Sequence, residues 1–267
     1  MAKSRLTLTI LGSGTSTGVP MIGCKCKICR SKHPRNNRLR ASALLEAQGK
    51  SVLIDTSTDL RQQALRFKIK RVDAVLYTHP HSDHISGIDE LRVFNFMQGA
   101  NIPVFGNDWT CDDLHQKYPY IFQPHTIAHH IKGGGTPQLV LNRFSSSLET
   151  LDILGVPVTP ISLEHGSKEC IGYRFNSVAY VTDCSYIPPA SLDRLKGLSV
   201  LVLDCVRIKP HGTHFNLEQA LKTVAELSPK KTFLTHLGHD LDYVEWVARR
   251  KLPKGVSFAY DGLKIKA

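Results

Sequence analysis

The chain has 267 residues, of which 42% are hydrophobic, 21% charged and 7% aromatic. This composition is that of an ordinary globular protein and excludes a disordered, collagen-like or fibrous chain. A net charge of +11 favours anionic partners such as phosphates or nucleic acids, without indicating which. The length fits one large domain over residues 1–267 with a single substantial core.

The first predicted strand spans residues 5–11 and ends before the glycine at position 12. Its apolar stretch is too short for a signal peptide or for a membrane span of about 20 residues. We therefore expect a cytoplasmic protein that has no membrane partner. Seven cysteines, an odd number, favour reduced thiols or metal ligation over a disulfide framework.

Two short motifs follow the first strand. Gly12, Gly14 and Gly18 do not form a dinucleotide or P-loop fingerprint, because neither a helix nor a GK[ST] sequence follows them. We predict a tight turn there instead. The next motif is CxCxxC, whose spacing is close to the tightest that a tetrahedral zinc site can use, and it consists of Cys24, Cys26 and Cys29.

Three thiolates need a fourth donor to close a structural zinc site, and His239 is our candidate. The alternative is a row of reduced thiols, which would be prone to oxidation. The other cysteines lack such spacing and are predicted to be small core residues, namely Cys111, Cys170, Cys184 and Cys205. The loop after the motif is rich in cations: Arg30, Lys32, Arg35, Arg38 and Arg40. They either bind a second phosphate or form a solvated charged loop, and the solvated loop is favoured.

Periodicity predicts the remaining elements. Strands are expected at 42–54, as a hairpin around Gln48 and Gly49, and at 72–78. Later β-rich runs, each ending in a polar residue, are 156–165, 178–183, 200–204 and 231–236. Helices are expected at 59–68, 86–97, 190–196, 217–227 and 242–250, the last two amphipathic. Strands and helices without regular alternation favour two sheets with helices outside them over a doubly wound parallel sheet.

Residues 111–150 interrupt this regularity with aromatic residues, histidines and three consecutive glycines. We interpret the segment either as an inserted flap over a site or as a surface excursion. A flap can close over its own site or pack against a neighbouring copy, so a homodimer is one option. The sequence does not indicate which arrangement holds.

A dense group of metal-binding residue types follows the strand at 72–78: His79, His81, Asp83 and His84. Side chains two apart in an extended chain point the same way, so His79 and His81 can hold one ion while Asp83 and His84 turn toward a second. Three further candidates each end a separate apolar strand: His165, Asp183 and His236. Strand ends along one sheet edge deliver polar groups into a common cleft.

The HxHxDH run resembles the signature of the metallo-β-lactamase fold superfamily, and the resemblance covers nearly the whole chain. It includes Asp55, where the family carries an aspartate that buttresses the metal loop. The resemblance implies an α+β fold, a four-layer αββα sandwich, with a dinuclear site. One divalent metal would be held by His79, His81 and His165, the other by Asp83, His84 and His236, with Asp183 bridging. Mn²⁺, Zn²⁺ or Fe²⁺ suits these ligands.

The opening LGSGTSTGVP, the CxCxxC motif and the HxxH pair His236 and His239 resemble the PhnP-like branch of this superfamily. In that branch the cysteines and the second histidine hold one structural Zn²⁺, which would link the N-terminal loop to the last metal strand. A histidine before the corresponding helix is thought to act as proton donor there, and His214 matches it. Spacing alone does not separate His214 from His211, and Asp204 is a candidate to orient the donor.

The predicted function is therefore that of a metal-dependent phosphodiesterase with Asp83 and His214 as catalytic residues. By resemblance its substrate is a small cyclic phosphate, of the phosphoribosyl 1,2-cyclic or 2′,3′-cyclic nucleotide type. One alternative is a tRNA 3′-processing endonuclease of the RNase Z type, with RNA as partner. The 18-residue interval from His165 to Asp183 is too short for the RNA-gripping arm of such enzymes. Another alternative, of a different class, is a non-catalytic zinc-stabilised nucleic-acid-binding module.

Overall fold

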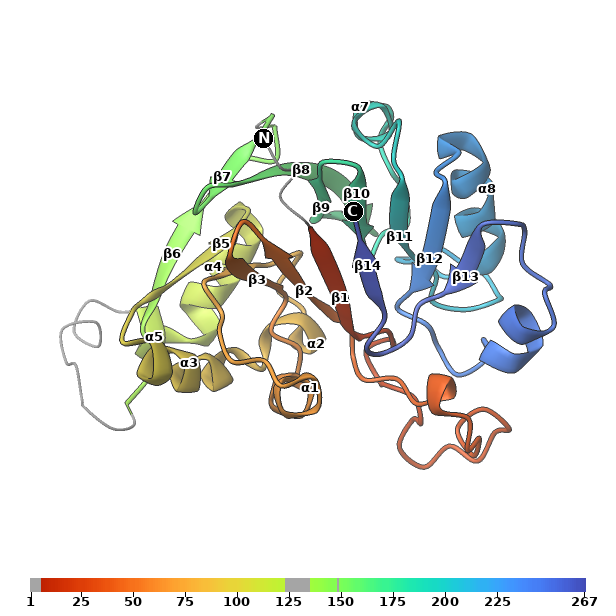
Figure 1. Cartoon of the computed structure of the whole chain (residues 1–267), viewed down its shortest axis with the longest axis horizontal. Coiled ribbons are helices and arrows are strands. Elements are labelled where there is room, and N and C mark those ends of the chain that lie inside the picture. The colour runs from red at the N-terminus through yellow and green to blue at the C-terminus, as the bar shows by residue number, and fades with distance from the viewer. Residues whose placement is uncertain (1–5, 123–134, 148) are drawn as a thin grey trace.

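The computed structural model describes residues 6–122, 135–147 and 149–267, and its strands form two mixed sheets (Figure 1). The first is seven-stranded, in the order β14-β1-β2-β3-β4-β5-β6. Its strands are β1 (Thr7–Gly12), β2 (Ser42–Ala47), β3 (Lys50–Ile54), β4 (Ala74–Leu76), β5 (Ile102–Gly106), β6 (Leu139–Arg143) and β14 (Lys264–Lys266). Pairing is antiparallel from β14 to β3 and parallel from β3 to β6.

The second sheet repeats this plan. It is also seven-stranded, in the order β13-β12-β11-β10-β9-β8-β7. Its strands are β7 (Leu151–Ile153), β8 (Val156–His165), β9 (Lys168–Phe175), β10 (Val178–Val181), β11 (Val200–Asp204), β12 (Lys231–Thr235) and β13 (Val256–Phe258). Pairing is antiparallel from β7 to β10 and parallel from β10 to β13.

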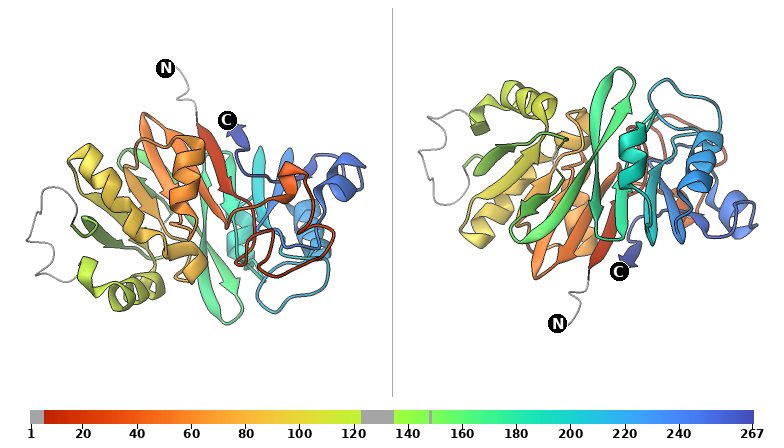
Figure 2. Two further views of the ribbon diagram at one scale, coloured as in Figure 1. Left: turned by 90° about the horizontal axis from the view of Figure 1, so that it is seen from below. Right: turned by 90° about the horizontal axis from the view of Figure 1, so that it is seen from above.

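Helices cover the outer face of each sheet, as the perpendicular views show (Figure 2). Those on the first sheet are α1 (Leu60–Phe67), α2 (Ser82–Ile85), η2 (Ile88–Glu90), α3 (Leu91–Gln98), α4 (Asp108–Lys117) and α5 (Pro119–Phe122). Those on the second are α7 (Pro189–Arg194) and α8 (Leu217–Leu227). Two short turns, η1 (Pro34–Asn36) and η3 (Val244–Ala248), lie in loops. The predicted four-layer αββα sandwich is confirmed.

Three apolar cores fill the spaces between these layers. The central core joins the facing sides of the two sheets, with Leu8, Val52 and Tyr180 among its fully buried members. A second core lies between the second sheet and its helices, and a third between the first sheet and its helices. Each sheet packs apolar side chains on both of its faces. Polar residues are therefore found mainly at the ends of the strands.

Several predicted elements are confirmed. β2 and β3 form the hairpin, with Gln48 and Gly49 at φ values of 51° and 74°. α8 begins with a reciprocal capping box between Asn216 and Gln219. The prediction of an amphipathic helix at 242–250 is wrong. The chain forms only the short π-helical turn η3 there, and none of the residues of η3 is fully buried. It ends where Arg250 takes a φ of 56°, which a right-handed helix cannot continue.

The segment at 111–150 contributes most of α4, together with α5 and β6, to the first sheet and its covering layer. Residues 123–134 and 148 within it lie outside the described residues, so its role as a flap stays a prediction. Among the described residues, no helix is both long and apolar enough to cross a bilayer.

Candidate dinuclear metal centre

The polar residues predicted as ligands meet at one edge of the sandwich. The carboxyl ends of β4, β8, β10 and β12 all reach this edge. β10 and β12 run parallel within the second sheet, and β8 runs in the same direction because antiparallel β9 separates it from β10. The first sheet contributes the HxHxDH loop, and the second contributes three separate strand ends. The candidate centre therefore lies between the two sheets.

A first cluster consists of His79, His81 and His165. His79 Nε2 lies 2.9 Å from His81 Nδ1, and His165 Nε2 lies 3.3 Å from that same nitrogen. Tetrahedral coordination with metal–nitrogen bonds near 2.1 Å places ligand nitrogens about 3.4 Å apart, so these spacings suit one ion. Burial lowers the pKa of all three imidazoles, which favours the neutral form that binds a metal.

A second cluster consists of Asp83, His84, Asp183 and His236. His84 Nε2 lies 3.3 Å from Asp83 Oδ2 and 3.2 Å from Asp183 Oδ2. His236 Nε2 lies 3.6 Å and 3.4 Å from the same two oxygens. Asp183 Oδ2 is also 3.6 Å from His79 Nε2 in the first cluster, which is the position that a bridging carboxylate needs.

The second cluster has the chemistry of a cation site. Among the described residues, His84 Nε2, both ring nitrogens of His236 and Asp204 Oδ1 are buried without a hydrogen-bond partner. Burial opposes a charge on His84, yet the carboxylates of Asp183, Asp83 and Asp55 hold its pKa well above the usual range. Buried polar atoms without partners are costly, and a divalent cation in this cluster would satisfy His84 Nε2 and His236 Nε2. His236 Nδ1 instead lies 3.7 Å from Asp204 Oδ1. The structure thus brings all seven donors together, while their binding of metals stays a prediction.

A layer of hydrogen bonds behind the donors orients their rings. His84 Nδ1 donates to Asp55 Oδ2 over 2.7 Å, and Thr78 donates to Asp55 through both its N–H and its hydroxyl, each at 2.8 Å. His165 Nδ1 donates to the Thr213 carbonyl over 2.7 Å. Each bond fixes the proton on Nδ1 and leaves Nε2 for a metal.

Three residues of this edge adopt left-handed backbone conformations. Asp55, Asp183 and His236 have φ values of 62°, 57° and 59°, which are uncommon for residues other than glycine. Each follows a parallel strand, so the chain turns sharply and its side chain enters the space between the sheets. Backbone strain of this kind is concentrated at functional sites. The positive φ values could not be predicted from the residue types at these positions.

His214 lies beside both clusters and Asp204 is its partner. His214 Nδ1 is 3.2 Å from Asp204 Oδ2, and its ring lies 4.7 Å from that of His236 and 4.8 Å from that of His165. Burial opposes a charge on His214, but Asp204 outweighs it and raises the pKa to about 9. His211 lies 5.0 Å from the His214 ring and accepts from the Thr213 N–H, so of the two predicted candidates His214 is the one that contacts Asp204.

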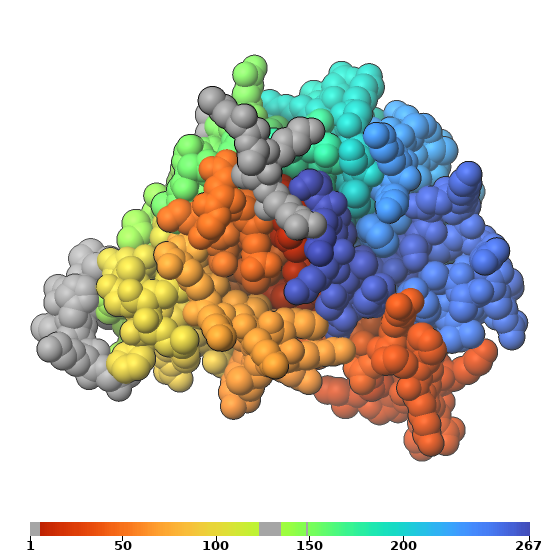
Figure 3. Space-filling view, viewed as in Figure 1, coloured from red at the N-terminus to blue at the C-terminus, as the bar shows by residue number. Residues whose placement is uncertain are grey.

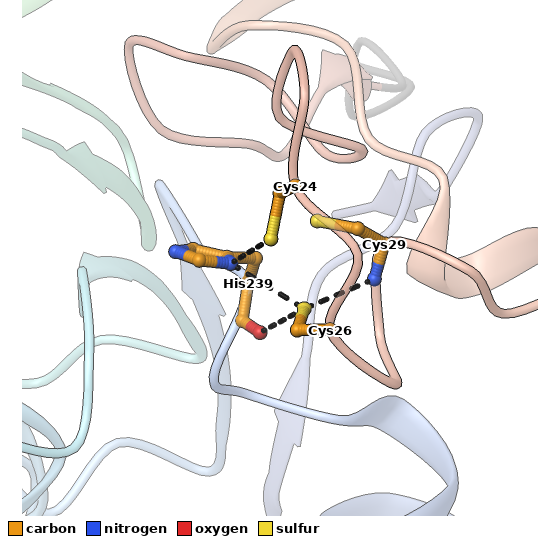
Figure 4. Close-up of side chains that lie close together, drawn as sticks. All are labelled: Cys24, Cys26, Cys29 and His239. Carbon is orange, nitrogen blue, oxygen red and sulfur yellow. Dashed lines mark hydrogen bonds between the residues drawn. The ribbon is translucent and has the colours of Figure 1, made fainter.

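The four predicted zinc donors also lie close together, where the loop after β12 meets the loop that carries the CxCxxC motif (Figure 4). Cys24 Sγ and Cys26 Sγ lie 3.3 Å and 3.5 Å from His239 Nδ1, and the Cys29 sulfur lies within 4.8 Å of the other donors. The Cys29 N–H donates to Cys26 and lowers the pKa of that thiol to about 6, which favours the thiolate that a metal binds. Cys111, Cys170, Cys184 and Cys205 are buried.

Arg30 and Lys32 of the cationic loop are exposed, as expected of a solvated loop, but Arg38 and Arg40 differ from that prediction. Arg38 is only 1% exposed and donates to the carbonyls of Gly238 and Leu241, so it is neither a solvated charge nor a phosphate ligand. Arg40 pairs with Asp59. The segment around Arg38 also explains two glycines, because a Cβ at Gly12 would lie 1.9 Å from the Arg40 carbonyl and one at Gly14 would lie 2.9 Å from that of Arg38.

The sequence analysis did not single out Trp109. It follows β5, another parallel strand that ends at this edge, and its ring lies 5.8 Å from that of His81 and 6.3 Å from that of His79. The sequence analysis predicted no strand at 102–106, so nothing in it marked Trp109 as lying after a strand that ends at the site.

Comparison with known proteins identifies the family. A β-lactamase superfamily domain matches residues 50–237. The crystal structure of a diphosphatase from the PhnP family superposes with a TM-score of 0.89 at 43% identity, covering 98% of this chain and 97% of that one. An octanoyltransferase of Porphyromonas gingivalis is 34% identical over 257 residues, which are 96% of this chain and 50% of the relative.

Ribonuclease Z of Clostridioides difficile is 26% identical over 154 residues, which are 55% of this chain and 47% of the relative. The chain thus spans about half the length of these two curated relatives. The matched domain contains the HxHxDH loop and the three strand-end donors, and the PhnP-family protein is similar over almost its full length. The chain therefore belongs to the metallo-β-lactamase superfamily of hydrolases, in its PhnP-like branch.

Proposed function

We propose that this hydrolase is a dinuclear-metal phosphodiesterase that opens a small cyclic phosphate. The observation that carries the proposal is the position of Asp183 Oδ2, within 3.6 Å of donors in both clusters. Two divalent cations at these donors would lower the pKa of water toward neutrality and neutralise charge on the phosphate. Mn²⁺, Zn²⁺ and Fe²⁺ all suit this ligand set. The similar diphosphatase also acts at phosphorus, which supports the reaction class.

The chain's own residues would perform the remaining steps. Asp83 and Asp183 would hold the second cation, and their carboxylates would offset part of its positive charge. The Nδ1–H of His214 donates to Asp204, which leaves Nε2 to deliver a proton to the departing alkoxide. Asp204 also accepts from the Phe215 N–H over 3.1 Å, so the pair is fixed at the start of the α8 segment. The substrate class is inferred from the resemblance of the sequence to the PhnP-like branch. We favour two types, phosphoribosyl 1,2-cyclic phosphates and 2′,3′-cyclic nucleotides.

The rival functions make different demands on this site. Between His165 and Asp183 the chain is occupied by β9 and β10, which are integral to the second sheet. An RNA-gripping arm of the RNase Z type has no place in that interval. A non-catalytic binding module would have no use for a carboxylate shared between two clusters.

Turnover of bis-p-nitrophenyl phosphate tests the proposal directly. We expect hydrolysis that depends on added Mn²⁺ or Zn²⁺ and is abolished by Asp83→Ala, because the second cluster then loses a carboxylate. The matched control is Asp193→Ala, which removes an exposed carboxylate on α7 and should leave the rate unchanged. No turnover by fully metallated protein with Mn²⁺, Zn²⁺ or Fe²⁺ would contradict the phosphodiesterase function.

A further inference from the structure

The cysteines of the CxCxxC motif differ from the other cysteines of the chain in their exposure. Cys24, Cys26 and Cys29 are half-buried, whereas the other four cysteines are fully buried. Lys25 and Lys27, which alternate with the first two, are exposed cations. Partly exposed thiols in an electropositive environment are the ones that oxidants reach, whereas buried thiols stay inert. The predicted zinc donors therefore include the most accessible sulfur atoms of the chain.

The sulfur atoms of this motif are close enough to react with one another. All three lie within 4.8 Å of one another (Figure 4). The Cys29 N–H donates to Cys26 Sγ over 3.4 Å, and the Met21 N–H donates to Cys29 Sγ over 3.3 Å. Cys26 and Cys29 are separated by two residues, the Cys-X-X-Cys spacing of thiols that form and break disulfides. This pair is therefore suited to forming a disulfide.

The fourth donor of the cluster links these thiols to the metal centre. His239 Nδ1 lies 3.3 Å from Cys24 Sγ and 3.5 Å from Cys26 Sγ. His236 of the second metal cluster lies three residues before His239, on the same loop after β12. A change at the sulfur atoms that releases His239 therefore acts on the loop that carries a predicted metal ligand.

The same loop packs against the segment that leads to His214. The Gly238 N–H donates to the Val206 carbonyl over 2.8 Å, and a Cβ at Gly238 would lie 2.6 Å from that oxygen. Asp240 accepts from the Ile208 N–H over 2.9 Å. A shift of the loop would therefore also disturb the segment that holds the predicted proton donor.

We propose that Cys26 and Cys29 form a reversible redox site, at which hydrogen peroxide joins the two sulfur atoms in a disulfide and the predicted zinc ion is released. The site itself rests on the geometry of the motif. Its effect on turnover rests on the proposed phosphodiesterase function. Oxidation would lower the activity of the centre, and a dithiol reductant would restore it.

The oxidation takes place in two steps. The Cys26 thiolate attacks one oxygen of hydrogen peroxide, which breaks the O–O bond and gives a sulfenic acid and a hydroxide ion. The Cys29 thiolate then attacks the sulfenic sulfur, forms the disulfide and expels a second hydroxide ion. Two electrons thus pass from the two sulfur atoms to the peroxide, and two protons from solvent convert the hydroxide ions to water.

The disulfide removes two of the four predicted zinc donors. Cys24 and His239 remain, and two donors do not close the tetrahedral site that a structural zinc ion needs. The zinc ion would leave, and His239 would lose its anchor at the sulfur atoms. The loop after β12 would then hold His236 less firmly at the second metal cluster.

Peroxide treatment of the reduced, zinc-loaded protein tests the site itself. Trypsin cuts after Lys25, Lys27 and Arg30, so each cysteine of the motif lies on a separate peptide. We expect a non-reducing peptide map to show residues 26–27 joined to residues 28–30. A chromogenic zinc chelator should detect one zinc ion released per chain, and dithiothreitol followed by added zinc should reverse both changes.

Two variants show which thiols respond. Cys29→Ser lacks the thiol that closes the disulfide, so dimedone should trap a sulfenic acid on Cys26 and no joined peptide should form. Cys111→Ser removes a buried thiol, is the matched control and should respond as the wild type does. The peptide map of the wild type needs no variant, so it remains decisive if Cys29→Ser loses its fold.

Turnover measures the link to the metal centre. We expect kcat for bis-p-nitrophenyl phosphate to fall about tenfold in the oxidised wild type, which is the lower end of the loss seen when the support of a metal ligand is removed. Reduction and added zinc should restore it. The oxidised Cys29→Ser protein tells whether the disulfide itself is needed, because it should not release zinc through that bond.

Each failure has a distinct meaning. A disulfide between other cysteines, or oxidation of the buried cysteines before the motif, would overturn the redox site. Zinc retained by the oxidised protein, or unchanged turnover in an active wild type, would overturn its link to the centre. No turnover by the reduced wild type would contradict the proposed function, while the peptide map and the zinc release would still decide the redox site.

Discussion

Asp55 connects β3 to the metal loop through hydrogen bonds with Thr78 and His84. It is fully buried, adopts a left-handed backbone conformation and accepts three hydrogen bonds from Thr78 and His84. Burial raises its pKa, although His84 and Thr78 oppose that shift. Asp55 receives the Nδ1 proton of His84, so it determines which ring nitrogen faces the second cluster.

Replacement of Asp55 by asparagine tests this orienting role. Asparagine tolerates a positive φ, so the backbone can stay in place. If its oxygen still accepts from the Thr78 N–H, its amide group faces His84 and forces the proton onto Nε2. We expect Asp55→Asn to weaken metal binding about 10–100-fold with an unchanged circular dichroism spectrum. Chelator competition measures the affinity, and wild-type affinity would show that Asp55 does not orient His84.

His214 and His211 provide a second test at the same scale. A proton donor matters most when the leaving group is a basic alkoxide and little when it is p-nitrophenolate. We expect His214→Ala to lower kcat for adenosine 2′,3′-cyclic phosphate about 100-fold or more, and to lower it much less for bis-p-nitrophenyl phosphate. His211→Ala is the matched control and should have little effect on either. Equal losses on both substrates would assign His214 a structural role instead.

At the scale of elements, the loop between β1 and β2 (residues 13–41, here called the N-terminal loop) and the loop after β12 form one unit. The N-terminal loop projects beside the C-terminal part of the molecule (Figure 3). Gly14 bridges to both Arg40 and Leu237, and Asp261 accepts from the N–H groups of Ser13 and Leu39. Arg38 joins the unit by binding carbonyls on either side of His239. The predicted zinc donors come from both loops, so a zinc ion would complete this connection.

Arg38 should therefore contribute to stability and not to substrate binding. Arg38→Met leaves two buried carbonyls without their donor, so we expect a loss of about 3 kcal/mol in the free energy of unfolding. Arg30→Met removes an exposed cation from the same loop and should change that free energy by less than about 0.5 kcal/mol. Urea denaturation compares the two variants. Similar denaturation midpoints for the two variants would show that the contacts of Arg38 with these carbonyls do not stabilise the fold.

The elements that the sequence predicted well share one property. β8, β10, β11 and β12 are apolar runs that end in a polar residue, and the seven candidate donors were found because they end such runs or follow β4. β9, with Lys168, Glu169 and Arg174, was not predicted because its polar residues hide the alternation. β14 is three residues long and depends on pairing with β1 across the whole sequence. Arg38 was misjudged because its partners lie 200 and 203 residues away.

At the scale of the whole molecule, the two sheets have the same mixed plan and meet at the ends of their parallel strands. The first sheet supplies His79, His81, Asp83 and His84, and the second supplies His165, Asp183 and His236. Neither sheet alone could complete either cluster. The central claim is that this junction holds two divalent cations, with a third metal at the cysteine cluster.

Anomalous diffraction from crystals of the metallated protein tests that claim most directly. Data collected at the absorption edge of the bound metal should show two peaks about 3.5–4 Å apart between the histidine and aspartate clusters. Data at the zinc edge should show a further peak among Cys24, Cys26, Cys29 and His239. A single peak at the junction of the sheets, or none, would contradict the dinuclear centre. So would two peaks with Asp183 bound to neither of them.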